Sequence, residues 1–256
     1  LSAKKSAPIL MVNAKNGGKD TSGAIEYISK NLEKGGTIYI LGGPNAVSEK
    51  AASAYAKYGK VKRLAGDDRY ATNLAILKEA GGVSGEDLLI CDGSNFADAL
   101  SCSALGKPIL LVDKYNIGLS SGQKSYIKSA KKIYIIGGTA SVPEKYEKLI
   151  GKSITRVAGA DRYETSIKIA KKFSSSYAGK RAVIVTGTNF PDGLSGGPLA
   201  YALGAPLILT SNDSWNYDKA KSYVGSKKVV TLGGVNSLAD STVKTVRSGK
   251  IQSKTY

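Results

Sequence analysis

The chain has 256 residues, and at about 150 residues per domain this length suggests one to three domains. Hydrophobic residues make up 42% and charged residues 22%, so the chain is globular, and the absence of histidine excludes Ser-His-Asp catalysis and histidine-ligated zinc. Lysine and arginine number 37 against 20 aspartates and glutamates, and the net charge of +17 predicts an anionic partner.

Residues 1–60 predict only the second half of a repeating unit. Residues 8–11 (PILM) form a Pro-apolar run, and Gly42 and Gly43 form a double glycine that returns later in the chain. Because the chain starts at Leu1 and its only methionine is Met11, we expect it to be part of a longer protein.

Two complete repeats follow, at residues 61–153 and 154–250. Four motifs occur in the same order in both, and a unit of about 95 residues is long enough to bury a core of its own. The motif pairs are 66–70 (GDDRY) with 159–163 (GADRY), 93–98 (GSNFAD) with 187–192 (GTNFPD), 108–111 (PILL) with 206–209 (PLIL), and 137–138 with 233–234 (both GG). Residues 251–256 are expected to be a tail or linker.

The third repeat predicts alternating helices and strands. Its first helix is expected at residues 161–173, because Asp161 can cap it and Glu164 has the spacing of a capping box. The elements expected after it are a strand at 182–185, a helix at 191–203, a strand at 207–209, a helix at 217–224, a strand at 229–232 and a final helix after the double glycine.

Strands that are apolar on both faces and alternate with helices predict an α/β fold with a parallel sheet. The Pro-apolar runs are expected to be central strands. Ligands of such sheets bind beyond the carboxyl ends of the strands. We therefore expect function in the loops at 93–95, around Asp113 and at 137–138, and in their counterparts in the other repeats.

Residues 63–70 (RLAGDDRY), 95–100 (NFADAL), 108–111 (PILL) and 135–138 (IIGG) together resemble the type 2 cell wall binding repeat. That repeat occurs in cell wall and surface-layer proteins of clostridia and related Gram-positive bacteria. The resemblance implies tandem Toprim-like units around a pseudo-threefold axis. It also implies a secreted protein that is anchored noncovalently to an anionic secondary wall polysaccharide, with other surface-layer proteins as further candidate partners.

Polysaccharide-binding residues are predicted on two grounds. The resemblance associates the Pro-apolar segments with binding, whereas the arginines suit phosphate or carboxylate and the asparagines suit sugar hydroxyls. The predicted residues are Pro8, Ile9, Leu10, Met11, Arg63, Arg69, Asn95, Pro108, Ile109, Leu110, Leu111, Arg156, Arg162, Asn189, Pro206, Leu207, Ile208 and Leu209.

Structural explanations compete with each of these assignments. Asp68 and Asp161 with their neighbouring arginines also fit helix caps and ion pairs, and Asn95 and Asn189 also fit turns. The Pro-apolar runs also fit a core, and the double glycines fit tight turns, because no Gly-Lys-Ser/Thr sequence completes a phosphate-binding loop.

The two cysteines are expected to be small buried thiols. Cys91 and Cys102 correspond to Val185 and Gly196 in the next repeat, so one copy does without sulfur at both positions. If the two thiols meet, a disulfide is the alternative in an exported protein.

Two rival functions are weaker. A nucleic-acid-binding Toprim-like protein is the alternative that the charge supports, but no Asp-x-Asp follows a strand and no aromatic residues interleave with basic ones. An amidase or peptidase would need a repeated nucleophile–base pair, which is absent. We therefore expect no enzymatic activity, no cofactor, no metal, no nucleic acid and no membrane insertion.

Overall fold

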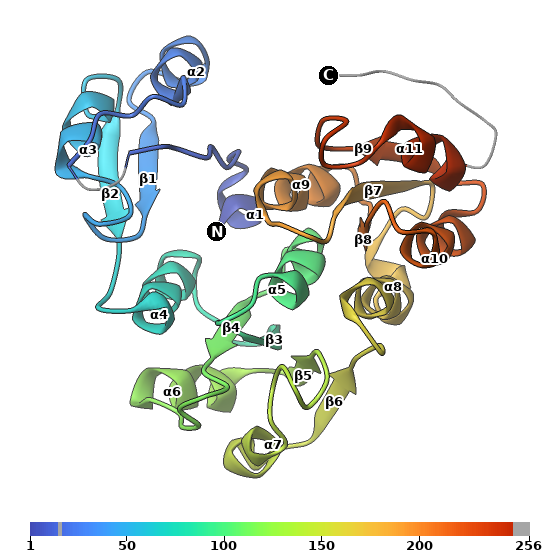
Figure 1. Cartoon of the computed structure of the whole chain (residues 1–256). Coiled ribbons are helices and arrows are strands. Elements are labelled where there is room, and N and C mark those ends of the chain that lie inside the picture. The colour runs from blue at the N-terminus through green and yellow to red at the C-terminus, as the bar shows by residue number, and fades with distance from the viewer. Residues whose placement is uncertain (15–16, 248–256) are drawn as a thin grey trace. The chain divides into compact units, whose positions relative to one another are not determined.

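The computed structural model describes residues 1–14 and 17–247 (Figure 1). The predicted tail at residues 251–256 lies outside the described residues. The chain divides into two compact units: unit 1 comprises Leu1 and residues 9–82, and unit 2 comprises residues 2–8 and the chain from Val83 onward. In the described part of the chain, no helix has the length and apolar character needed to cross a membrane.

Unit 1 is a parallel strand pair covered by helices. Its elements are α2 (Ala24–Asn31), β1 (Thr37–Leu41), α3 (Glu49–Tyr55), β2 (Lys60–Leu64) and α4 (Arg69–Glu79). β1 pairs with β2 in parallel, from Thr37 opposite Lys60 to Leu41 opposite Leu64. Ile28, Ile40 and Tyr55 belong to one buried cluster, so α2 and α3 pack on this sheet.

Unit 2 contains a four-stranded and a three-stranded sheet. Its elements up to residue 150 are α1 (Ser2–Lys5), β3 (Asp87–Asp92), α5 (Ala97–Cys102), η1 (Ser103–Leu105), β4 (Ile109–Val112), α6 (Ser121–Ser129), β5 (Lys132–Ile136) and α7 (Lys145–Ile150). Those after it are β6 (Ile154–Val157), α8 (Arg162–Lys172), η2 (Ser174–Ser176), β7 (Arg181–Thr186), α9 (Pro191–Ala202), β8 (Leu207–Thr210), α10 (Ser214–Val224), β9 (Lys228–Thr231) and α11 (Asp240–Val246). The sheets are parallel, with orders β4-β3-β5-β6 and β8-β7-β9.

Strands β2 and β6 are not among the elements expected from the sequence. β6 opens the third repeat in sequence but pairs with β5 of the second, with Ile133 opposite Ile154 and Ile136 opposite Val157. β2 pairs with β1 in the same way. Each of these strands therefore extends the sheet that precedes it. Alternation of charged and apolar residues in KVKRL, residues 60–64, is the signal that indicates β2.

Two of the three Pro-apolar runs form edge strands and residues 8–11 form no strand, so their expected central position is wrong. β4 and β8 lie at one end of their sheets, yet β8 is buried along its whole length. Its edge is covered because α8 packs beside it and Ser166 Oγ accepts a hydrogen bond from the Leu209 N–H. At β4, the buried Gln123 of α6 donates to the Leu111 carbonyl. These contacts satisfy edge groups that water would otherwise reach.

Helix α8 joins the two sheets of unit 2 (Figure 1). Ile169 and Phe173 pack in the cluster below the β3–β6 sheet, whereas Ile167 and Ala170 pack in the cluster of the β7–β9 sheet. The Phe173 ring meets Tyr134 of β5 edge-on, with 4.9 Å between centroids. Residues 83–153 and 154–247 therefore share a hydrophobic core, which explains why they belong to one unit, whereas residues 61–82 of the second repeat belong to unit 1.

Helix α9 approaches the preceding repeat closely because of its glycines. A Cβ on Gly193 would overlap the Leu100 side chain, and one on Gly197 would overlap Ser103. α9 can therefore pack tightly against α5 and η1. Ala97, Leu100 and residues of β7 and β8 share a buried cluster as a result.

The expected helix caps are present. Asp68 and Asp161 accept hydrogen bonds from the N–H groups of Ala71 and Glu164, each at 2.7 Å. The Glu164 carboxylate accepts from the Ala160 N–H rather than from the cap residue, so the capping box is only half formed. The structure thus has the predicted α/β class with parallel sheets; the pseudo-threefold arrangement stays a prediction.

Candidate functional site

The carboxyl ends of the parallel strands bring most predicted motifs together in unit 2. The loop after β3 leads into α5, the loop after β4 leads toward α6, and the double glycine follows β5. Because all strands of a sheet run in the same direction, these loops share one edge of the sheet. The β7–β9 sheet repeats this arrangement.

The two double glycines of unit 2 face aspartates at the start of α5 and α9. Gly137 has φ 101°, and a Cβ there would overlap Oδ2 of Asp98; at Gly233 a Cβ would lie 2.6 Å from Oδ2 of Asp192. Asp98 is buried, and its side chain bonds with Ser141. Burial raises the pKa of this carboxyl, although the Ser141 hydrogen bond and the charge of Arg162 oppose the rise.

Arg63 and Arg156 hold the double-glycine turns. Each donates from Nη1 to the carbonyl of the first glycine, Gly42 or Gly137, at 2.8 Å. Arg156 also pairs with Glu147 at 2.6 Å, and Arg63 pairs with Glu49 at 3.1 Å. Both guanidinium groups are therefore engaged within the fold, and the structural explanation accounts for their positions.

Arg162 lies where the two complete repeats meet. Its guanidinium donates to the Gly187 carbonyl at 2.7 Å and lies 5.3 Å from the centroid of the Phe96 ring. Phe96 in turn contacts Phe190, the matching residue of the next repeat, at 5.8 Å between centroids. Arg69, its counterpart, is exposed at the start of α4 in unit 1.

The predicted asparagines are exposed at the strand ends. Asn95 accepts a hydrogen bond from the Ala97 N–H at 3.3 Å, which fits the turn explanation. Asn189 is exposed in the equivalent loop after β7. Both side chains are therefore accessible to a ligand.

The Pro-apolar segments differ in accessibility. Leu110, Leu207, Ile208 and Leu209 are at most 1% exposed, so an external polymer cannot touch their side chains. Residues 8–11 belong to no helix or strand, and within them Met11 is 44% exposed. Pro108 and Pro206 are buried, and Ile109 and Leu111 are half-buried. In unit 2, the most accessible residues near each segment are therefore those of the loop that follows the strand.

Those following loops carry a pattern that the sequence prediction missed. Residues 113–116 (DKYN) follow β4, and residues 213–216 (DSWN) come soon after β8. In both, the Asp side chain accepts a hydrogen bond from the N–H of the aromatic residue, at 2.9 Å for Tyr115 and 2.8 Å for Trp215. The repeated Asp-x-aromatic-Asn sequence is the signal that reveals it.

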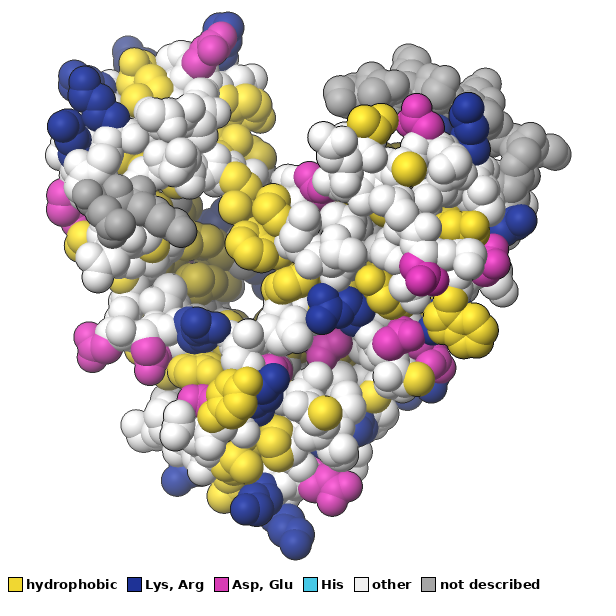
Figure 2. All heavy atoms as spheres, in the orientation of Figure 1, with side chains coloured by type: hydrophobic (Ala, Val, Ile, Leu, Met, Phe, Trp, Pro, Cys, Tyr) yellow, Lys and Arg dark blue, Asp and Glu magenta, His cyan; other side chains and the backbone are white. Residues whose placement is uncertain are grey.

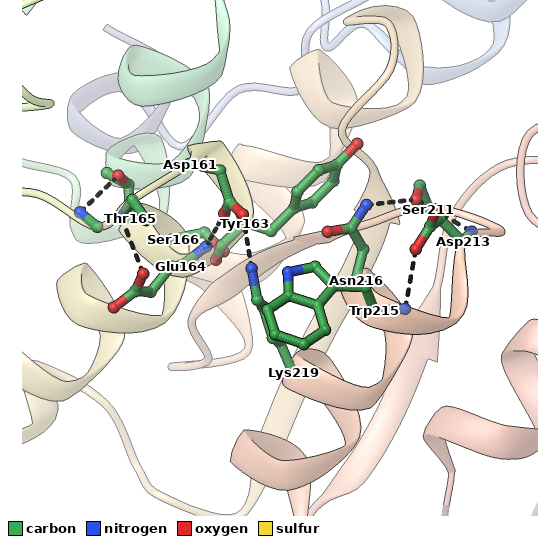
Figure 3. Close-up of polar contacts among 12 residues, drawn as sticks. Asp161, Tyr163, Glu164, Thr165, Ser166, Ser211, Asp213, Trp215, Asn216 and Lys219 are labelled. Carbon is green, nitrogen blue, oxygen red and sulfur yellow. Dashed lines mark hydrogen bonds and ion pairs between the residues drawn. The ribbon is translucent and has the colours of Figure 1, made fainter.

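A cation lies against each of these aromatic rings. Lys114 Nζ is 5.1 Å from the Tyr115 centroid, and Lys219 Nζ is 5.0 Å from the Trp215 centroid. Figure 3 shows Lys219 between the Trp215 ring and the carboxylate of Asp161, with which it pairs at 2.5 Å. Burial raises the pKa of Asp161, but hydrogen bonds from the Glu164 N–H and Lys219 outweigh it and lower the pKa below its usual value.

Basic residues are otherwise dispersed. On the face drawn in Figure 2, lysine and arginine side chains are scattered among uncharged ones rather than gathered in one patch. The described residues contain no group of three or more acidic or cysteine side chains placed to hold a metal ion. Cys91 and Cys102 are buried as free thiols with 3.7 Å between their sulfurs.

Comparison with known proteins identifies relatives in Bacillus subtilis. The chain is 30% identical over 236 residues to N-acetylmuramoyl-L-alanine amidase LytC of Bacillus subtilis (strain 168), covering 90% of this chain and 45% of that protein. It is 29% identical over 256 residues to the amidase enhancer of the same organism, covering 94% of this chain and 34% of the relative. The chain thus spans less than half the length of these relatives.

Two solved structures are similar to this chain over nearly its whole length. Cwp8 from Clostridium difficile superposes with a TM-score of 0.79 at 26% identity over 96% of this chain and 43% of that one. Cwp6 from Clostridium difficile gives a TM-score of 0.82 at 25% identity over 96% of this chain and 40% of that one. The family described as cell wall binding domain 2 (CWB2) matches residues 1–52, 63–147 and 156–243. The protein therefore belongs to the cell wall binding domain 2 family.

Proposed function

We propose that this chain anchors a surface protein to the Gram-positive cell wall by binding an anionic secondary polysaccharide, without making or breaking a covalent bond. The observation that carries the proposal is the net charge of +17 in a chain of a cell wall binding family. Scattered lysines create a positive field that attracts a polyanion from solution.

The strand-end loops are the proposed contact surface. They are exposed, they recur in the two complete repeats, and they carry asparagine side chains that suit sugar hydroxyls. Arg69 and Arg162 stay proposed contacts at the starts of α4 and α8. Several weak contacts on one polymer chain raise overall binding by about 10² to 10⁴.

Co-sedimentation tests the proposal. The purified chain is mixed with cell walls of Bacillus subtilis and of Clostridium difficile, the species of its relatives, and with the same walls stripped of phosphodiester-linked polymers by hydrofluoric acid. We expect binding to at least one intact wall preparation and loss of that binding after stripping. Equal binding to stripped walls would contradict a polysaccharide ligand.

Wall binding is also measured at raised salt and in the presence of a competing polyanion. Attraction between exposed charges is screened within about 10 Å at 0.1 M salt, so wall binding should weaken as salt is raised. Double-stranded DNA added at about 150 mM salt should not displace the chain from walls. Displacement by DNA would instead favour the nucleic-acid alternative.

A further inference from the structure

Tyr115 and Trp215 are the most exposed aromatic side chains in the described residues, at 75% and 71%. Single exposed apolar residues are ordinary at protein surfaces. Here, however, both rings belong to an Asp-x-aromatic segment in which the Asp side chain accepts a hydrogen bond from the aromatic N–H, and both segments follow equivalent strands. Tyr115 lies three residues after β4, and Trp215 lies five residues after β8, in the first turn of α10. Recurrence of an exposed aromatic after the same strand of two sheets points to a shared ligand.

The turns hold the backbone of both aromatic residues in place. Asp113 and Asp213 hold the backbone N–H of the aromatic residue, and Asp113 also accepts from the Asn116 amide at 3.0 Å. In the other loop, Asn216 donates instead to Ser211 Oγ at 2.9 Å. A backbone that is already ordered in this way loses little further freedom when a ligand binds the ring.

A lysine lies beside each ring, but the two lysines come from different positions in the sequence. Lys114 precedes Tyr115 directly, whereas Lys219 follows Trp215 by one helical turn of α10, and the ammonium-to-centroid distances are still 5.1 and 5.0 Å. Lys219 is held there by Asp161, and Lys114 by the buried carboxylate of Asp92 at 3.4 Å. Each loop therefore presents an apolar ring beside a positioned cation.

We propose that the Trp215–Lys219 and Tyr115–Lys114 pairs are two similar subsites, each binding an acidic sugar residue of the wall polysaccharide. This inference rests on the function proposed above and names where that function is carried out. The C–H face of the sugar packs on the aromatic ring, and its carboxylate or phosphate pairs with the ammonium. The ligand class is a glycan whose sugars carry negative charge.

Trp215 reports on its own occupancy because it is the only tryptophan of the chain. Glycan released from the walls that bind the chain is titrated into the unaltered protein while Trp215 emission and its quenching by acrylamide are followed. We expect a saturable change in emission and weaker quenching, since the ring becomes covered. Wall binding of the unaltered chain with no change in either signal would overturn the subsites and leave the proposed function standing.

Variants separate the two proposals further. Trp215→Ala and Lys219→Gln should each weaken wall binding about tenfold, and Trp215→Ala with Tyr115→Ala about 100-fold, if the two contacts add. Trp215→Phe keeps a flat ring and should retain most of the affinity.

Matched controls are Tyr27→Ala, which removes an exposed aromatic from α2, and Lys221→Gln, which makes the same charge change on α10. Circular dichroism checks that each variant is folded. Equal losses in controls and subsite variants would overturn the inference. No sedimentation of the unaltered chain with any wall would overturn both the proposed function and the subsites.

Discussion

Unit 1 and unit 2 build the same double-glycine turn with different surroundings. Gly42 and Gly137 both have positive φ, 108° and 101°, and both accept an arginine hydrogen bond at 2.8 Å. Beside Gly137 lies the buried Asp98, whereas a Cβ on Gly42 would meet only Ala46. The turn is therefore formed by glycine and arginine alone, and the carboxylate is added by the first half of a complete repeat.

The loops before α2 and α10 differ in the same manner. Asp20 accepts a hydrogen bond from the Ser22 N–H at 2.8 Å, as Asp213 does from Trp215. The Asp-to-backbone hydrogen bond is the same, but Asp213 caps α10 directly whereas Gly23 lies between this bond and α2, and unit 1 has serine where unit 2 has an exposed aromatic ring. The local hydrogen bond is thus shared between the units, and the chemistry available to a ligand is not.

The largest loss of folding stability is expected from alanine substitutions at Gly42 and Gly137. Both substitutions force a non-glycine residue into a strained backbone conformation, which costs about 1 to 3 kcal/mol. Gly137→Ala must also displace the Asp98 carboxylate, which adds about 1 to 3 kcal/mol. Urea unfolding followed by circular dichroism should show Gly137→Ala to be the more destabilised by at least about 1 kcal/mol. Equal losses would mean that Asp98 contributes nothing at the turn.

The contributions of Asp98 in unit 2 and Asp20 in unit 1 to folding stability should depend on pH in opposite directions. Burial raises the pKa of Asp98, so its folded form holds the proton longer than the unfolded chain does, and its contribution to stability falls as pH rises above about 4. Burial also raises the pKa of Asp20, but hydrogen bonds from Ser22 and Tyr55 outweigh it and lower the pKa. Its contribution is present above about pH 4 and lost as pH falls below that value.

Urea midpoints of Asp98→Asn and Asp20→Asn between pH 3 and 7 measure this difference. Relative to the unaltered chain, Asp98→Asn should gain stability as pH rises, and Asp20→Asn should lose stability as pH rises. Asp240→Asn, an exposed aspartate at the start of α11, is the control. Parallel curves for all three variants would contradict the assignment.

A smaller effect is expected from placing an aromatic ring in unit 1. Ser22→Trp puts tryptophan at the turn position that Trp215 occupies in unit 2. Because the substitution adds a ring without adding a lysine beside it, we expect wall affinity to rise only about two- to threefold. Ser29→Trp on the exposed side of α2 is the control. A larger gain from the control than from Ser22→Trp would show that the turn has no special role.

The two thiols of the second repeat should not react with a thiol reagent in the native protein. Cys91 and Cys102 are fully buried, and the contact between them together with burial raises the pKa of Cys91. We expect no labelling by a thiol reagent in minutes at pH 8, and two thiols per chain in urea. Fast native labelling would contradict their burial, and failure to label in urea without reductant would indicate a disulfide.

Local sequence determined the elements whose signals lie within a few residues. Asp68 and Asp161 cap the predicted helices because a cap needs only its own side chain and the next turn. The apolar runs at β7, β8 and β9 became strands at nearly the expected residues. Repetition of ordered motifs was sufficient to indicate the family.

Tertiary structure alone decided how these elements combine. The pairing of β6 with β5 and the edge positions of β4 and β8 depend on residues far apart in the chain, so no local pattern encodes them. The same holds for Asp98 at Gly137 and Lys219 at Asp161, which lies 58 residues away in sequence. Helix α8 buries the edge of β8 from outside its sheet, which is why an edge strand has the composition of a central one.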